Sequence, residues 1–167
     1  VIEQIVAELM KVSDNMLIVT NTFSDYEFLG LPMVEDKWKG MGPLAGIHAG
    51  LLATTAERNL IVACDMPFVS AKLGSVLLEE LDHYDAVIPE VDGRLHPLFA
   101  AYRKGVKDEV NRSLEKGELR IRSIFQHLHV KIMDENEFKK HRFQLEDMNL
   151  FNMNYPAEYE QAKKMLK

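Results

Sequence analysis

Apolar residues fall into two patterns along the chain: short unbroken runs, and longer stretches with helical periodicity. The runs are typical of strands buried on both faces, and the periodic stretches are typical of helices with one apolar face. We expect strands at residues 16–20, 60–64, 85–89, 98–103 and 128–133, and a short extended segment at 31–34. We expect helices at 2–10, 25–29, 42–55, 71–81, 104–116 and 120–127, and a last one from Pro156. Strands that alternate with helices predict an α/β fold, a Rossmann-like three-layer domain with a mainly parallel sheet.

One turn signal modifies this alternation. The tetrapeptide 91–94, Val-Asp-Gly-Arg, is typical of a tight turn between two strands, so we expect 98–103 to run antiparallel to 85–89. The stretch 135–141 is rich in charged residues, and we expect it to be a solvated surface segment.

Composition narrows the classes of function. The 167 residues are 47% hydrophobic, which suits a single domain over 1–167, and the net charge of −6 argues against a nucleic-acid polymer as partner. No apolar run reaches about 18 residues, so we expect neither a membrane-spanning helix nor a membrane partner. The single cysteine, Cys64, favours a reducing compartment and hence the cytoplasm, and we expect its thiol to be packed and inert in a buried strand. The six histidines lack zinc-ligand spacing, so we expect no zinc site.

Asp65 directly follows the apolar run 60–64, and Pro67 prevents the strand from continuing. Open α/β sheets bind ligands at the carboxyl ends of their strands, so this carboxylate is a candidate ligand-binding group. The simplest partner is a divalent ion that carries a phosphorylated substrate, because Mg²⁺ needs only one or two carboxylates. Two alternatives remain open: Asp65 caps the helix that begins near Ser70, or its side chain faces solvent.

Other polar residues and glycines follow predicted strands or begin predicted helices. They are Asn21, Glu35-Asp36, and the glycines Gly42 and Gly46 at the start of helix 42–55. Asn152 and Asn154 lie two residues apart near the end of the chain, so in an extended segment both amides point to the same side. Amides donate and accept hydrogen bonds, which suits a polar heterocycle or a phosphate. Alternatively, Asn154 caps the last helix, and the glycines serve only a turn and helix packing.

The order of these motifs resembles that of the molybdenum cofactor guanylyltransferase family over nearly the whole chain. The matching elements are Val34-Glu35-Asp36, Gly42-Pro43-Leu44-Ala45-Gly46, Cys64-Asp65-Met66-Pro67, Asp-Gly-Arg-Leu-His-Pro-Leu at 92–98, and Asn152-Met153-Asn154-Tyr155-Pro156. The Asp-x-Pro and Gly-Pro-Leu-Ala-Gly elements occur across the wider nucleotidyltransferase-like group. The Asn-x-Asn-x-Pro ending, combined with the His-Pro strand, is specific to this branch.

The resemblance implies roles for individual residues. Asp65 corresponds to the catalytic group that binds Mg²⁺ and the nucleotide phosphates. Asp36 corresponds to a contact with the guanosine end of GTP, and Asn21 matches a nucleotide-contacting asparagine at a different spacing. Gly42 and Gly46 correspond to the nucleotide wall. Asn152, Asn154 and His96 correspond to positions that face the pterin substrate.

The resemblance also implies the reaction and its partners. The protein is expected to transfer GMP from GTP to the molybdenum–molybdopterin cofactor, forming molybdopterin guanine dinucleotide and pyrophosphate. Other molybdenum cofactor biosynthesis proteins and acceptor molybdoenzymes are the implied protein partners. Two rivals remain: a CTP-using nucleotidyltransferase that acts on a pterin or sugar phosphate, and a non-catalytic nucleotide-binding protein.

One element of the family pattern lies outside the sequence that begins at Val1. The family opens with a strand and a glycine-rich loop whose Arg and Lys hold the GTP phosphates. We expect such residues upstream of Val1, with a strand that fills the slot beside 17–19 and 60–63.

Overall fold

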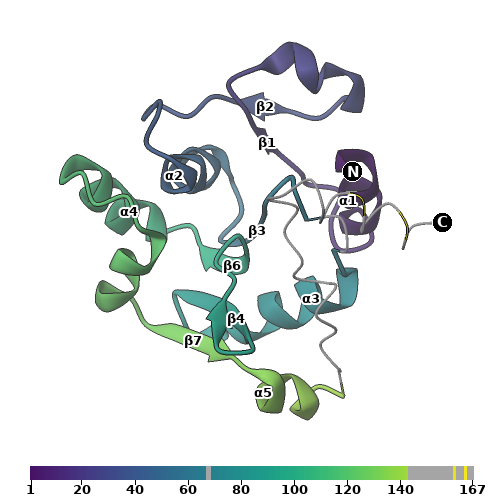
Figure 1. The fold of residues 1–167 in the computed structure, drawn as a ribbon, viewed down its shortest axis with the longest axis vertical. Coiled ribbons are helices and arrows are strands. Elements are labelled where there is room, and N and C mark those ends of the chain that lie inside the picture. Colours follow the sequence, from purple (N-terminus) through teal and green to yellow (C-terminus); the bar gives the residue numbers. More distant parts are fainter. Residues whose placement is uncertain (67–68, 143–159, 161–163, 165–167) are drawn as a thin grey trace.

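The main sheet contains the strands β3 (Arg58–Val62), β6 (Phe99–Arg103), β4 (Ala86–Val91) and β7 (Val130–Met133), in that order, and β5 (Arg94–Leu95) pairs with the end of β4 (Figure 1). The computed structural model describes residues 1–66, 69–142, 160 and 164. A second, two-stranded sheet consists of β1 (Ile18–Val19) and β2 (Met33–Val34). The α-helices are α1 (Ile2–Leu9), α2 (Pro43–Ala53), α3 (Ala71–Glu79), α4 (Val106–Glu115) and α5 (Glu135–Lys140). The 3₁₀ turns are η1 (Phe23–Asp25), η2 (Glu27–Leu29), η3 (Glu80–His83) and η4 (Ile121–His127).

The direction of β6 corrects the expectation of a mainly parallel sheet. Strands β3, β4 and β7 run in one direction, but β6 lies between β3 and β4 and is antiparallel to both. The reason is the short connection from β4, since Asp92 (φ 52°) and Gly93 (φ 72°) form a tight turn into β5 and the chain returns at once. A parallel neighbour would need a much longer crossover. The α/β class and the antiparallel return of 98–103 are confirmed.

Alternate residues of β4 and β6 supply two separate hydrophobic cores. Val87, Phe99 and Ala101 pack with α3 and α5 on one face, and Ile88, Ala100 and Tyr102 pack with α2 and α4 on the other. This alternation follows from the two-residue repeat of a strand. The arrangement confirms the three-layer architecture, with helices on both faces of the sheet (Figure 1).

Helix α2 joins the small sheet to the main sheet. It contacts β1 and β2, while its buried residues Leu44, Ile47 and Leu51 belong to the core that also covers Ile61 of β3. In the described part of the chain, β1 pairs only with β2, and β3 pairs only with β6. Both strands therefore keep one edge without a partner among those residues.

Several segments differ locally from the predicted elements. The predicted helices at 25–29 and 120–127 are 3₁₀ turns, and the predicted strand at 16–20 contracts to the two residues of β1. The charged stretch at 135–141 lies at the surface as predicted, since Glu135, Lys139 and Lys140 are exposed. It forms a helix, α5, that buries Phe138 fully, which the charge pattern did not predict. The helix predicted from Pro156 begins outside the described residues. Among those residues, no helix combines the length and apolar character that a membrane crossing requires.

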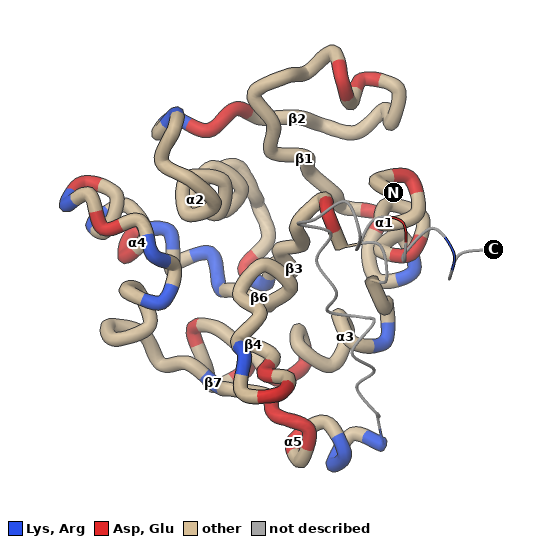
Figure 2. Tube along the Cα trace, in the orientation of Figure 1, with Lys and Arg blue, Asp and Glu red and all other residues tan. Residues whose placement is uncertain are grey.

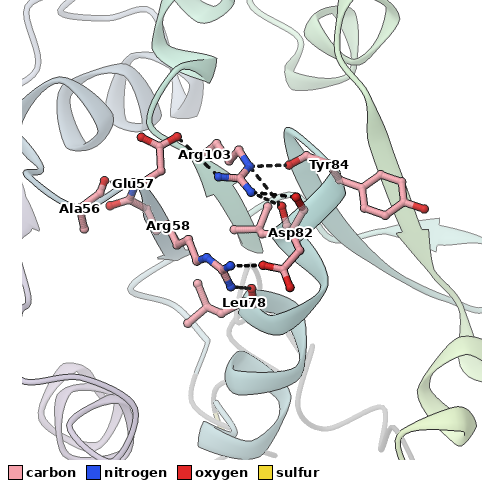
Figure 3. A network of polar contacts seen from close by, with 9 residues as sticks. Ala56, Glu57, Arg58, Leu78, Asp82, Tyr84 and Arg103 are labelled. Atoms are coloured by element: carbon pink, nitrogen blue, oxygen red, sulfur yellow. Dashed lines mark hydrogen bonds and ion pairs between the residues drawn. The ribbon is translucent and has the colours of Figure 1, made fainter.

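Arg103, at the end of β6, connects the sheet to the end of α3–η3 through hydrogen bonds to backbone carbonyl groups (Figure 3). Its Nε donates hydrogen bonds to the carbonyl oxygens of Leu81 and Tyr84, both at 3.1 Å. Its Nη2 donates to the carbonyl oxygens of Leu81, at 2.7 Å, and Asp82, at 3.1 Å. One guanidinium group thus satisfies several carbonyl groups that a helix end leaves without intrahelical partners.

Arg58 on β3 binds the same helix end from a more exposed position. Its guanidinium donates to the carbonyl oxygen of Leu78 at 3.1 Å and pairs with the Asp82 carboxylate. The Arg58 side chain is 44% exposed, compared with 26% for Arg103.

We expect Arg103→Lys to lower the free energy of unfolding by about 1–3 kcal/mol, because a lysine ammonium cannot reproduce the planar fork and leaves partly buried carbonyls unpaired. Arg58→Lys is the matched control and should cost less than about 1 kcal/mol, since exposed ion pairs contribute little. Urea unfolding of both variants measures the difference. An equal decrease in the free energy of unfolding in both variants would contradict the conclusion that Arg103 stabilises this helix end more than Arg58 does.

Candidate active site

Asn21 and Asp36 meet where β1 and β2 end. The two strands are parallel, with Ile18 opposite Met33 and Val19 opposite Val34, so their carboxyl ends lie together. Asn21 Nδ2 donates to Asp36 Oδ2 at 3.0 Å, and the backbone N–H of Asp36 donates to Asn21 Oδ1 at 3.2 Å. The second carboxylate oxygen, Asp36 Oδ1, is buried and has no hydrogen-bond partner in the described part of the chain. The pair is therefore fixed in orientation and retains one free acceptor.

Asp65 lies in the turn after β3, and the structure decides against the capping alternative. Ser70 is the N-cap of α3, and its own hydroxyl accepts a hydrogen bond from Leu73 N at 3.2 Å. Asp65 Oδ1 is buried and lacks a hydrogen-bond partner among the described residues. Since burying an unpaired carboxylate oxygen is costly, this group is suited to a cationic partner such as a metal ion.

His96 belongs to the segment that runs beside the end of β3. Ala63 N donates to the carbonyl oxygen of Leu98 at 2.8 Å, so residues 96–98 lie next to the turn that contains Asp65. The backbone N–H of His96 donates to Pro89 O at 2.9 Å, which fixes the segment. Burial, and secondarily the charge of Arg94, lowers the pKa of His96, so its imidazole is neutral near pH 7 and both donates and accepts hydrogen bonds.

Gly42 and Gly46 lie at the start of α2, but only Gly42 has a backbone conformation that requires glycine. Gly42 is the N-cap residue with φ 73° and ψ −162°, a conformation open essentially to glycine alone. Gly46 has ordinary helical backbone, and a Cβ added there would meet no atom of the described residues within 4 Å. Packing against the described residues therefore does not explain the missing side chain at 46, and they leave the space beside it open to a ligand. The N-terminus of α2 also carries no side-chain cap, which suits the approach of an anion.

The structure joins some of the predicted site residues and leaves others apart. Asn21 contacts Asp36, and the His96 segment adjoins the end of β3, but no hydrogen bond or ion pair within the described ranges connects Asp65 to the Asn21–Asp36 pair. The described residues also contain no group of three or more His, Cys, Asp or Glu side chains that could hold a metal alone. Asn152 and Asn154 lie outside the described residues.

The prediction that Cys64 is packed was wrong. The strand β3 ends at Val62, two residues earlier than expected, and Cys64 lies exposed in the following turn. Desolvation by its immediate surroundings, and secondarily the charge of Asp65, raises the pKa of the thiol. Cys64 is therefore mostly protonated at neutral pH, and the expectation of low reactivity now rests on its pKa instead of burial.

The sequence analysis missed His48, a buried polar residue on α2. It is 6% exposed, and its Nδ1 has no hydrogen-bond partner among the described residues. The available signal was its position as the one polar side chain in the segment Pro-Leu-Ala-Gly-Ile-His-Ala-Gly-Leu-Leu-Ala, residues 43–53.

Comparison with known proteins gives consistent matches over most of the chain. Residues 1–132 match the MobA-like NTP transferase domain. A probable molybdenum cofactor guanylyltransferase of Carboxydothermus hydrogenoformans is 33% identical over 165 residues, which cover 99% of this chain and 82% of the relative. A molybdenum cofactor guanylyltransferase of Desulfosudis oleivorans is 30% identical over 167 residues, which cover the same shares of the two chains.

Solved structures share the fold. The molybdopterin-guanine dinucleotide biosynthesis protein A of Archaeoglobus fulgidus superposes with a TM-score of 0.80 at 26% identity, covering 99% of this chain and 84% of that one. The 2-C-methyl-D-erythritol 4-phosphate cytidylyltransferase of Thermus thermophilus gives a TM-score of 0.72 at 17% identity, covering 98% and 87%. At that lower identity the similarity shows the fold alone.

We expect the two glycines at the start of α2 to respond differently to alanine. Gly42→Ala should lower the free energy of unfolding by about 1–3 kcal/mol, because the backbone conformation at 42 is strained for any residue with a Cβ. Gly46→Ala should leave the protein as stable or raise its stability by up to about 1 kcal/mol, since alanine favours a helix interior and meets no atom there. Thermal or urea unfolding measures both, and a destabilised Gly46→Ala variant would show that packing does require glycine at 46.

Proposed function

The chain belongs to the MobA-like NTP transferase family, and from that premise we propose that it is a molybdenum cofactor guanylyltransferase. The enzyme transfers GMP from GTP to the molybdenum–molybdopterin cofactor and releases pyrophosphate. The structural observation that carries the proposal is the buried, unpaired carboxylate oxygen of Asp65 at the carboxyl end of β3. Relatives with this name match nearly the whole chain, including that turn.

A divalent metal, which we propose to be Mg²⁺, fits the residues present. Asp65 offers one carboxylate with an oxygen that lacks a hydrogen-bond partner among the described residues, and Mg²⁺ completes its coordination with waters and substrate phosphates. When bound, the metal would neutralise charge on the α-phosphate. Asp65 is thus the proposed catalytic residue, through its hold on the metal and the nucleotide phosphates.

The Asn21–Asp36 pair is the proposed binding group for the guanosine end of the nucleotide. Guanine presents adjacent N–H donors on its pairing edge, and the free Oδ1 of Asp36 is an acceptor whose orientation Asn21 already fixes. Gly42 and Gly46 form the proposed wall against which the nucleotide lies, because the space beside Gly46 is open.

The acceptor substrate is proposed to lie on the His96 side of the site. The neutral imidazole of His96, in the segment that adjoins the Asp65 turn, provides a donor and an acceptor for a pterin heterocycle. Asn152 and Asn154 are the further pterin contacts, proposed from the sequence motif that precedes Pro156.

Positioning and charge neutralisation suffice for the proposed chemistry. A terminal phosphate oxygen of the pterin cofactor attacks the α-phosphate of GTP in line, the bond to the β-phosphate oxygen breaks, and pyrophosphate leaves. The attacking phosphate is already ionised, so no residue needs to act as a general base. The residues of this chain hold the two substrates in line and supply the carboxylate for the metal.

A further strand with a phosphate-binding loop and two classes of protein partner complete the proposal. The edges of β1 and β3 that lack a partner strand among the described residues support a further strand between them, whose glycine-rich loop would direct backbone N–H groups at the phosphates. Other molybdenum cofactor biosynthesis proteins would supply the pterin, and acceptor molybdoenzymes would receive the product. The single cysteine of the chain agrees with a cytoplasmic setting.

We expect GTP to be preferred when the protein is incubated with Mg²⁺, the molybdenum–molybdopterin cofactor and each of GTP, CTP, ATP and UTP. Formation of the dinucleotide and of pyrophosphate, measured by chromatography and a coupled assay, should occur at least tenfold faster with GTP. A preference for CTP would assign the protein to cytidylyl transfer, and nucleotide binding without any turnover would support a non-catalytic role.

Asp65→Asn should reduce Mg²⁺-dependent turnover by two or more orders of magnitude and leave the fold intact, because the neutral amide is a far weaker ligand for Mg²⁺. Asp14→Asn, at an exposed position before β1, is the matched control for the loss of one carboxylate and should retain full activity. Steady-state kinetics and circular dichroism of both variants provide the readouts. Near-normal turnover by Asp65→Asn would remove this residue from the mechanism.

A further inference from the structure

An open groove of about 720 Å³ lies between α2, α4 and the segment that connects β2 to α2. Its lining includes Lys37, Trp38, His48, Lys107, Asn111 and Arg112. The volume falls within the range of small-molecule sites. The function proposed above uses none of these side chains.

Three basic residues, Lys37, Lys107 and Arg112, line this groove, although the chain as a whole is acidic. Figure 2 shows that α4 carries both basic and acidic residues. Lys37 forms no ion pair within the described ranges. Lys107 lies 3.5 Å from its neighbour Asp108, and Arg112 lies 2.6 Å from Glu109. Lys37, His48 and Lys107, which come from three segments, line the same groove. Burial, and secondarily the charges of the two lysines, lowers the pKa of His48. The lining also contains one carboxylate, Asp108, so three basic side chains line the groove with one acidic side chain. An anion is the ligand that this excess of positive charge favours.

His48 adds an independent sign of a ligand. Its side chain lines the groove from the otherwise apolar helix α2, it is 6% exposed, and its Nδ1 lacks a hydrogen-bond partner among the described residues. Buried polar atoms are normally paired, so an unpaired one at the base of a cationic groove indicates a missing partner. A neutral imidazole beside two lysines is suited to donate to a phosphate oxygen.

Trp38 gives the groove an aromatic side. The residue is half-buried, packs against the core that contains α2 and α4, and also lines the groove. Asn111 of α4 also lines the groove, and its Nδ2 donates a hydrogen bond to Glu115 Oε1 at 3.1 Å. An aromatic ring beside cationic groups suits a ligand that carries both a planar ring and a phosphate.

The groove is distinct from the proposed active site. Gly42 and Gly46 form the proposed nucleotide wall, and Gly46 lies only two residues before His48 on α2. A step of two residues turns an α-helix by about 200°, so Gly46 and His48 lie on nearly opposite faces of α2. The two sites are connected through the backbone, because Asp36 of the proposed active site and Lys37 of the groove are consecutive residues.

We propose that the groove between α2 and α4 is a second binding site, for a nucleoside phosphate, with the phosphate held by Lys37, Lys107 and His48 and the base against Trp38. Because Lys37 directly follows Asp36, occupation of the groove restrains the segment that carries the proposed base-binding carboxylate. The site is therefore placed to let a nucleotide modulate the active site.

Trp38 is the single tryptophan of the chain, so its intrinsic fluorescence reports on the groove. Titration with guanosine 5′-monophosphate should change the Trp38 emission in a saturable, salt-sensitive manner. The double substitution Lys37→Gln/Lys107→Gln should raise the apparent Kd at least tenfold. Lys116→Gln, at the exposed end of the same helix α4, is the matched control and should leave the Kd unchanged.

Further titrations distinguish the possible sources of the change in Trp38 fluorescence. Inorganic pyrophosphate should compete with the nucleotide, and guanosine without phosphate should not compete. If guanosine competed and pyrophosphate did not, the groove would recognise only the base, and the proposal would be overturned. Asp36→Asn should leave the titration intact, and loss of the signal in that variant alone would mean that Trp38 reports on the active site. No response to millimolar nucleotide, or a response only to a polyglutamate peptide, would also overturn it, the latter in favour of an acidic protein partner.

Discussion

The pairing of β6 between β3 and β4 is the constraint on which the rest of the structure depends. Because β6 is antiparallel to both neighbours, its last residue, Arg103, emerges beside the end of α3 and η3 and binds their carbonyl groups. At its other end, the ladder continues past Val62 and Phe99 and places the His96 segment next to the Asp65 turn. A single strand thus sets one helix on the sheet and aligns the two sides of the proposed site.

Much of the main sheet and its helices could be predicted from the sequence, and the features that could not be predicted have physical reasons. The Asp92-Gly93 turn predicts the reversal into β6 because both residues must adopt positive φ, and few dipeptides do so readily. Phe138 escaped prediction as a core residue, since one apolar side chain among charged neighbours gives no periodic signal. Cys64 was misplaced because a strand boundary depends on where its ladder ends, and for β3 that is decided by β6, about forty residues away.

In the candidate sites too, residues positioned by neighbouring sequence could be predicted, and residues brought together by long-range packing could not. Asn21 and Asp36 each follow a predicted strand, and the parallel pairing of β1 with β2 brings the two side chains into reciprocal hydrogen bonds. The groove had no such signature, since Lys37 and Lys107 come together only when α2 packs on α4. The sequence therefore predicts groups placed by strand ends, whereas groups placed by helix packing become visible only in the fold.

The separate pairing of β1 and β2 has a consequence for motion. Two short, half-buried strands depend chiefly on α2 for their hold on the main sheet, while β4 and β6 are buried on both faces. Segments with little buried apolar surface open at a lower free energy than the core, so the β1–β2 unit forms a separate cooperative unit of opening. Amide protons near Asn21 should exchange with solvent long before those of β6. The end of the molecule that carries the proposed base-binding pair can therefore open and close again around a substrate while the strands that precede Asp65 stay folded.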